Sequence, residues 1–474
     1  MTDNTEATRA AAIARARDAL DSGRFEADLA RRVAIPSVSR EAGRKGELES
    51  YLTDEMVPLY ERMGFDCTLW HHDKAPGPFL LAERIEAADL PTVLMYAHGD
   101  VVTGVPEQWS QGLHPFEMTE RSGRWYGRGT ADNKGQHSVN LAALDAVLET
   151  RGALGFNLKY LVEMGEESGS PALDAICEIH KDRLAADLLI ASDGPRMTLN
   201  DPTIFLGSRG GIDIHIEIVA REGYHHSGNW GGLLANPGVE LAHAITALIG
   251  PTGECLVPEL TPGTIPDAVR AALRDFVIET TEGDPELDAW WGAPGLTQPE
   301  RVYAWSTLEV MEIEVGNLAN PLYAIPPRAR ARLQLRHPVG VDQADVAPAI
   351  QRALDAAGHK RVRVVPRDDA SFPASRSDLD GPWVRFVARS MARTLDREPV
   401  ILPNLGGSLP NAIFTDTLAL PTIWIPHSYP GCRQHGADEH LPRSIVAEGL
   451  ALMAGIFWDL GATEHSKPTK VTAG

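Results

Sequence analysis

Short apolar runs alternate with longer stretches in which apolar residues recur every three or four positions through the first 208 residues. The short runs predict buried strands, and the longer stretches predict amphipathic helices. The expected strands are residues 79–85, 92–98, 158–164, 187–193 and 203–208, and the expected helices are residues 6–33, 45–63, 137–149 and 172–185. This alternation predicts an α/β domain whose mostly parallel sheet is flanked by helices on both faces.

Beyond residue 208 the strands change character, because apolar and polar residues alternate along them. Such alternation is typical of a sheet with one face on a core and the other exposed. The expected order is strand, helix, strand, strand, helix, strand, at residues 211–220, 237–249, 306–315, 329–337, 345–357 and 361–368. This order predicts an α+β two-layer sandwich. Residues 251–306, rich in Pro, Gly and Trp, are interpreted as a long excursion within it.

The α/β pattern returns near residue 378, with expected helices at residues 381–395 and 444–461 and expected strands at 399–405 and 420–426. The simplest organisation is one α/β domain formed by residues 1–208 and 374–474 and interrupted by an inserted α+β domain, residues 209–373. A chain of 474 residues is long enough for two such domains.

Composition narrows the class of protein. Hydrophobic residues make up 43% and charged residues 23%, as in soluble globular proteins. The 65 acidic and 44 basic residues give a net charge of −21, which argues against nucleic acid or an anionic membrane as a partner. Neither a membrane span nor a signal peptide is predicted, so a cytoplasmic location is expected. The 4 cysteines are scattered without a Cys-x-x-Cys pair, which favours reduced thiols.

Potential metal ligands stand where the apolar strands end, and one further carboxylate lies in a glycine-rich loop at residues 127–135. Neighbouring parallel strands bring their carboxyl ends to one edge of a sheet, so these side chains are expected to gather there. Two histidines and several carboxylates form a donor set for divalent metal ions. The residues concerned are His98, Asp100, Asp132, Glu166, Glu167, Asp193 and His435.

This set is sufficient for two metal ions. We expect His98 and Asp193 at one ion, Glu167 and His435 at the other, and Asp132 shared between them. Imidazole nitrogen and carboxylate oxygen suit zinc, which is the first expectation, and also manganese or cobalt.

Two of the acids are expected to act beside the metals. Asp100, two positions after His98, can accept a hydrogen bond from the free imidazole N–H and orient the ring. Glu166 and Glu167 are adjacent at a strand end and cannot both point the same way. Glu166 is therefore expected to face the water between the metals and act as the general base.

The order of these motifs resembles that of the dinuclear metallopeptidase family M-20. The motifs HGD, GRGTADNKG, EMGEESGS and SDG precede a late histidine, and similar segments extend from residue 30 to residue 445. The family includes aminoacylases, acetylornithine deacetylases, succinyl-diaminopimelate desuccinylases, glutamate carboxypeptidases and carnosinase-type dipeptidases. The resemblance implies the same metal ligands, the same base and the same supporting aspartate.

The resemblance also implies roles for residues outside the metal set. His226 of the inserted lid and dimerisation domain would stabilise the oxyanion, often in the active site of a partner subunit, so a homodimer is expected. Arg336 would hold the substrate carboxylate by a bidentate contact, and Gly407 and Ser408 would line the same pocket. The peptide bond between Asp132 and its successor would be cis.

Three places depart from the family pattern. His114 stands where an aspartate is usual, and Asp438 stands where an asparagine is usual before Glu439. The asparagine often found before Ile-Pro is replaced by Tyr323 or Ala324. These changes affect positions expected to support the site.

The expected reaction is hydrolysis of an amide bond in a small substrate with a free carboxylate, by a hydroxide held between the metals with Glu166 as the base. In the family, aspartate at the position of Asp193 is more typical of dipeptidases, as is a large inserted domain. A dipeptidase is the leading hypothesis, and an N-acyl-amino-acid amidohydrolase of the acetylornithine deacetylase type is the alternative. An inactive binding homologue is disfavoured, because the base and all five ligands are present.

Overall fold

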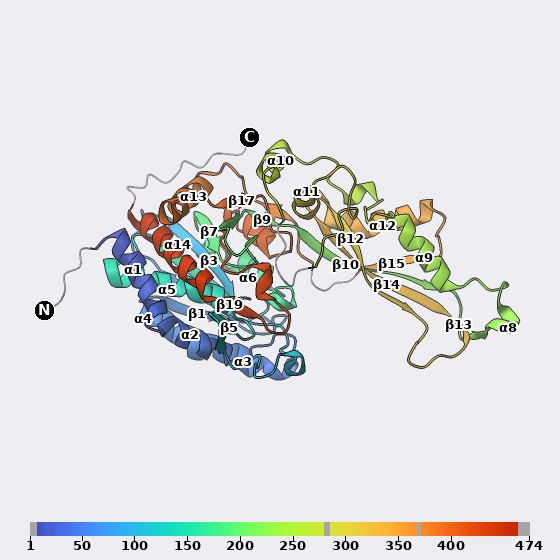
Figure 1. Cartoon of the computed structure of the whole chain (residues 1–474), viewed down its shortest axis with the longest axis horizontal. Coiled ribbons are helices and arrows are strands. Elements are labelled where there is room, and N and C mark those ends of the chain that lie inside the picture. The colour runs from blue at the N-terminus through green and yellow to red at the C-terminus, as the bar shows by residue number, and fades with distance from the viewer. Residues whose placement is uncertain (1–6, 279–284, 367–370, 463–474) are drawn as a thin grey trace.

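The computed structural model describes residues 7–278, 285–366 and 371–462. It has two lobes, each built on its own sheet (Figure 1). The larger lobe contains the first and last described helices, α1 and α14, and the smaller lobe extends from one side of it (Figure 1).

The large sheet has eight strands in the order β1-β2-β6-β3-β7-β18-β8-β17. The four central strands are parallel to one another. The β8–β17 pair is also parallel, whereas β1–β2, β2–β6 and β18–β8 are antiparallel. The strands are β1 (Asp66–Trp70), β2 (Phe79–Arg84), β6 (Asn157–Glu163), β3 (Thr92–His98), β7 (Leu188–Ala191), β18 (Thr422–Trp424), β8 (Thr203–Phe205) and β17 (Val400–Leu402). The predicted α/β class is confirmed, with a mixed sheet.

The elements that differ from the sequence-based prediction include β1 and the first helix. β1 was not predicted, because it is an edge strand whose five residues DCTLW are mostly half-buried and lack a clear apolar run. The helix expected at residues 6–33 is two helices, α1 (Arg9–Asp21) and α2 (Arg24–Val33). Gly23 separates them with φ +77°, a left-handed conformation that favours glycine.

Helices cover both faces of the large sheet, as the apolar runs predicted. Along β3, Val93, Met95 and Ala97 belong to one hydrophobic cluster, whereas Leu94 and Tyr96 belong to another. Successive strand residues point to opposite faces, so a continuous apolar run is expected wherever both faces are buried. The first face packs against α5 (Lys134–Arg151), α13 (Pro382–Leu395) and α14 (Arg443–Ala462), and the second against α6 (Leu173–Ile179).

One helix of the described residues, α14, is long and apolar enough to cross a membrane by length and composition. About two-thirds of its most apolar stretch, 67%, is buried inside the protein. It contacts α1, α5 and α13. This helix is therefore a core element of the large lobe.

The small lobe follows the predicted order of strands and helices. Its antiparallel sheet has the order β12-β14-β10-β15, and α9 and α12 pack on one face through residues such as Ile216 and Leu333. The division at residues 208/209 and 373/374 stays a prediction. The elements are β10 (Gly210–Val219), α9 (Pro237–Leu248), β12 (Thr307–Val315), β14 (Arg328–His337), α12 (Gln343–Ala356) and β15 (Arg363–Pro366); residues 367–368 of the last expected strand lie outside the described residues.

The excursion at residues 251–306 does not stay within the small lobe. Val269 and Leu273 of α10 (Asp267–Leu273) and Tyr303 of α11 (Gln298–Tyr303) pack in a hydrophobic cluster of the large lobe. The side-chain amide of Asn404 also donates to the Tyr303 carbonyl oxygen, 2.6 Å away. The excursion therefore joins the two lobes.

Candidate metal centre

The site lies at the carboxyl edge of the central strands. β3 is parallel to both of its neighbours, β6 and β7, with His98 opposite Glu163 at the ends of the first pair. The chain after β6 presents Glu166 and Glu167, and the chain after β7 presents Asp193. The parallel register therefore brings segments that are far apart in the sequence to one edge.

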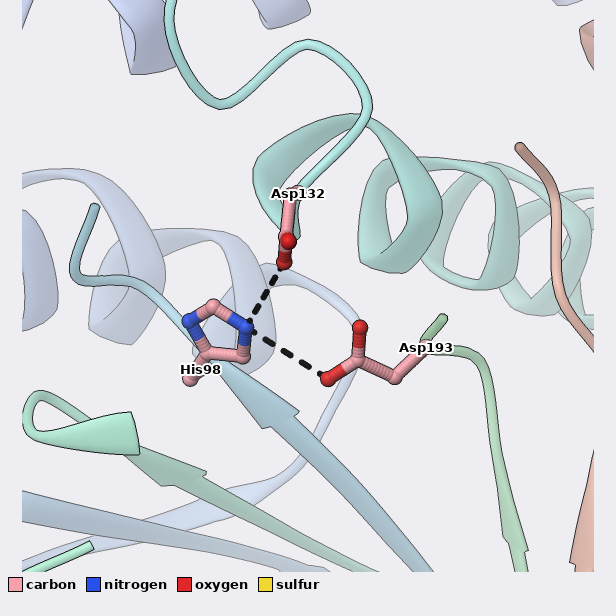
Figure 2. A group of neighbouring side chains, drawn as sticks. All are labelled: His98, Asp132 and Asp193. Carbon is pink, nitrogen blue, oxygen red and sulfur yellow. Dashed lines mark hydrogen bonds and ion pairs between the residues drawn. The ribbon is translucent and has the colours of Figure 1, made fainter. Parts of the chain in front are cut away.

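His98, Asp132 and Asp193 form one cluster of potential ligands (Figure 2). The Nε2 atom of His98 lies 3.2 Å from Oδ1 of Asp132 and 3.4 Å from Oδ2 of Asp193. Figure 2 shows the three side chains pointing toward one another from β3, from the segment before α5 and from the segment after β7. His98 and Asp193 are buried, and the side chain of Asp132 is 13% exposed.

A second cluster contains Asp132, Glu167 and His435. The Nε2 atom of His435 lies 3.2 Å from Oδ2 of Asp132 and 3.1 Å from Oε2 of Glu167. Asp132 thus offers one oxygen to each cluster, and the two groupings are those expected from the sequence. The peptide bond between Asp132 and Asn133 is cis, as the resemblance implied.

The donor set fits divalent cations. Within each cluster the potential ligand atoms lie within 4.8 Å of one another. Among the described residues, the buried Oε1 atom of Glu167 has no hydrogen-bond partner. A buried carboxylate oxygen without a partner is costly, and a cation would satisfy it. Nitrogen and oxygen donors of this kind suit zinc, manganese or cobalt.

The pKa values of the acids and of His435 are shifted because these titratable side chains lie close together. Burial raises the pKa of Glu167 to about 7, and it raises the pKa of Glu166 well above its usual range. Hydrogen bonds to Asp132 and Glu167 raise the pKa of His435 to about 11. Burial alone would raise the pKa of Asp132, but the two imidazoles hold it well below its usual range. A positive charge bound at the site would therefore stabilise the ionised forms of these carboxylates.

Asp100 contacts His98 differently from the sequence-based prediction. The Nδ1 atom of His98 lies 3.0 Å from the backbone oxygen of Asp100 and 3.4 Å from its Oδ1 atom. The carboxylate of Asp100 instead accepts the backbone N–H groups of Glu166 and Glu167, each at 3.1 Å. Asp100 therefore orients the imidazole mainly through its backbone, and its side chain holds the acidic pair.

Sequence reasoning did not assign a role to Glu439. Its buried carboxylate accepts the backbone N–H groups of Gly129, Ala131 and Asp132 at 2.9–3.1 Å and pairs with Arg128 at 2.6 Å. These contacts hold the loop that presents Asp132. The signal available was the Asp438-Glu439 pair, which was noted only as a departure from the family pattern.

A cleft of about 480 Å³ opens beside the two clusters, between the lobes. Glu166 lines it, as do Arg336, Gly407 and Ser408. The Nη1 atom of Arg336 donates to Oγ of Ser408 at 2.5 Å. The small-lobe sheet also contributes polar groups that sequence reasoning missed: Asp213, Arg332 and Gln334.

His226 lies outside this cleft. It ends β11 (His225–His226) and precedes α8 (Ser227–Trp230), at the tip of the small lobe farthest from the large sheet (Figure 1). Its side chain is exposed, and its Nδ1 atom accepts the N–H of Gly228 at 3.1 Å. Tyr323, in the adjoining loop, is 84% exposed and also lies away from the cleft.

Comparison with known proteins agrees with this geometry. The profile described as Peptidase family M20/M25/M40 matches residues 94–459. The beta-Ala-His dipeptidase of Homo sapiens is 33% identical over 397 residues, covering 81% of this chain and 77% of that protein. The cysteinylglycine-S-conjugate dipeptidase of Corynebacterium striatum is 27% identical over 399 residues, covering 80% and 83%.

The fold is also that of a solved relative. The crystal structure of human carnosine dipeptidase 1 aligns with a TM-score of 0.77 and 23% identity, over 95% of this chain and 99% of that one. The family profile spans most of the chain and includes both ligand clusters. The chain belongs to peptidase family M20/M25/M40, a family of metallopeptidases.

Proposed function

We propose that this protein is a dipeptidase that uses two divalent metal ions to hydrolyse the amide bond of a small peptide with a free carboxylate. One observation carries the proposal: two histidine–carboxylate clusters share Asp132, and most of their residues line one cleft together with Arg336. The cleft thus combines potential metal ligands with a cation for the substrate carboxylate.

In this proposal His98 and Asp193 hold one ion, Glu167 and His435 hold the other, and Asp132 binds both. Zinc is the first candidate, with manganese and cobalt as alternatives. When bound, two such ions would lower the pKa of a water molecule and polarise the substrate carbonyl.

Glu166 is the proposed general base. It lines the same cleft as Arg336 and the potential metal ligands, and two backbone N–H bonds to Asp100 fix the turn that carries it. Burial raises its pKa, so its carboxyl oxygen can take a proton and then deliver it to the leaving nitrogen.

Arg336 and Ser408 are the proposed carboxylate site, with Gly407 beside them. The guanidinium of Arg336 already donates to Ser408, and a substrate carboxylate could accept from its remaining N–H groups. Gly407 lines the cleft with no side chain, which lets the substrate approach the backbone.

A homodimer is proposed because His226 cannot serve the cleft of its own chain. β12 is an edge strand, and Met311 and Ile313 on it are 47% and 59% exposed. This open edge of the lid and dimerisation domain is suited to a second copy, in which His226 would stabilise the oxyanion. The test is to mix inactive His226→Ala and Glu166→Gln proteins: activity regained on mixing supports the dimer, and persistent inactivity contradicts it.

Residues 209–373 are proposed as the inserted domain, and the cytoplasm is the proposed location. The four cysteines are unpaired, which fits a reducing compartment.

The dipeptidase is favoured over an N-acyl-amino-acid deacylase because the relatives named above are dipeptidases. The test is hydrolysis of a dipeptide panel and of N-acetyl amino acids by the zinc-reconstituted protein. Cleavage of dipeptides supports the proposal. Cleavage of N-acetyl amino acids alone would support the deacylase, and cleavage of neither would favour an inactive homologue.

A further inference from the structure

A second cavity, of about 580 Å³, lies next to the cleft and has no role in the proposed chemistry. The described residues that line it include Trp291, Val302 and Trp305 from the excursion at residues 251–306. Arg336 lines both cavities, so the proposed carboxylate site forms the boundary between them.

The register of the small sheet explains this arrangement. Arg336 on β14 is paired with Gly211 of β10 on one side and with Thr307 of β12 on the other. Gly211 lines the cleft, and Thr307 lines the second cavity. The two spaces therefore lie side by side over one face of the sheet, on either side of Arg336.

The glycine-rich loop beside Ser408 is the second part of this boundary. Arg209, which lines the second cavity and is only 7% exposed, donates to the carbonyl oxygen of Gly406 at 2.7 Å and to that of Trp305 at 3.3 Å. A Cβ added to Gly406 would lie 3.0 Å from Val302. The excursion thus packs directly behind the loop that would contact the substrate carboxylate.

The chemistry of the second cavity suits an uncharged apolar group. Two indole rings and the aliphatic side chains of Ile278, Leu287 and Val302 contribute to its wall. Among the described residues, its charged lining residues are three arginines and three acids: Arg209, Arg301 and Arg336, and Glu286, Asp288 and Glu309. These described residues carry no net charge that would favour an anionic or a cationic side chain, whereas an aromatic ring gains from burial against indole.

We propose that this cavity binds the side chain of the carboxyl-terminal residue of the substrate, and that dipeptides ending in an aromatic or large aliphatic residue are preferred. The inference rests on the proposed function. In the bound dipeptide, the carboxyl-terminal residue would place its carboxylate on Arg336 and its amide nitrogen toward the metal clusters. The side chain on the Cα of that residue would then lie beside the second cavity. The excursion then acts as a specificity element.

The test compares kcat/KM for Ala-Gly, Ala-Leu and Ala-Phe with the zinc-reconstituted protein. Ala-Phe is expected to exceed Ala-Gly by about tenfold or more, which is the usual range for filling an apolar pocket. Trp305→Ala should lower that ratio by about tenfold, because the substituted side chain lines the cavity. Trp458→Ala is the matched control, since Trp458 is half-buried on α14 and absent from the lining, and it should keep the wild-type ratio.

A second measurement needs no variant. Free phenylalanine, as a product, should inhibit the wild-type protein at a concentration about tenfold lower than free glycine does. Equal kcat/KM values for the three dipeptides, or equal inhibition by the two amino acids, would overturn the inference and leave the proposed function standing. Hydrolysis of none of the dipeptides would instead overturn the proposed function itself.

Discussion

The guanidinium of Arg128 and the carboxylate of Glu439 form an ion pair that is almost entirely buried. The Nη1–Oε2 distance is 2.6 Å, and the two side chains are 3% and 0% exposed. The same carboxylate accepts backbone N–H groups of Ala131 and Asp132. The pair therefore holds the loop that presents Asp132.

Replacing Arg128 by Met should destabilise the protein by about 3–5 kcal/mol, because it leaves a buried carboxylate without its cation. Urea unfolding measures the change in the free energy of unfolding. Arg15→Met is the matched control, since Arg15 pairs with Glu149 on the surface and should contribute little. Equal stability of the two variants would contradict the importance of the buried pair.

Glu166→Gln should lower kcat by at least about a hundredfold while the zinc content per chain stays at the wild-type level. The amide keeps the size of the side chain but cannot take a proton. Steady-state kinetics and elemental analysis measure the two quantities. Glu178→Gln, at an exposed position of α6, serves as the control. An active Glu166→Gln enzyme would exclude Glu166 as the base.

Asp132→Asn should impair binding at both metal positions, whereas Asp193→Asn should impair only one. Asp132 directs its two oxygens to different histidines, and Asp193 belongs to a single cluster. Zinc titration by calorimetry should show two weakened sites in the first variant and one intact site in the second. The same stoichiometry for both variants would argue against a shared Asp132.

Arg336→Met should raise the KM for dipeptides by about tenfold to a hundredfold with a smaller effect on kcat, because it removes a charge-assisted contact to the substrate carboxylate. Arg330→Met on the same strand is the control, since Arg330 does not line the cleft. The expected defect should disappear for a substrate whose carboxylate is amidated. An unchanged KM would place the carboxylate elsewhere.

Acid stability should depend on His427, which is fully buried and has no hydrogen-bond partner on either ring nitrogen among the described residues. Burial lowers the pKa of His427 to about 3, below the value of about 6.5 in an unfolded chain. Its contribution to stability is therefore complete above pH of about 6.5 and is lost as the pH falls toward 3.

The wild-type free energy of unfolding should fall by up to about 1.4 kcal/mol per pH unit from this residue in that window. His427→Gln should reduce the slope, and His71→Gln, at an exposed position, should not. Urea unfolding between pH 7.5 and pH 4.5 measures the slopes. Identical slopes in all three proteins would show that His427 does not control acid stability.

Part of the site could be predicted from the chain because strand periodicity and ligand chemistry are local properties. His98, Asp193 and Glu167 each follow a recognisable apolar run, and parallel strands bring their carboxyl ends together. Tyr303 and the excursion around it gave no such signal, because irregular segments rich in Pro and Gly lack a period that indicates what they pack against.

The amino-acid sequence by itself determined the α/β class, the order of elements in the small lobe and the side chains that gather in the two clusters of potential ligands. Only the tertiary structure decided that Asp100 supports the acidic pair, that Glu439 holds the loop of Asp132, and that the excursion crosses back to the large lobe. These contacts join residues that are distant in the sequence and do not belong to one helix or strand. Their partners depend on how the lobes pack, and no pattern along one segment of the chain encodes that packing.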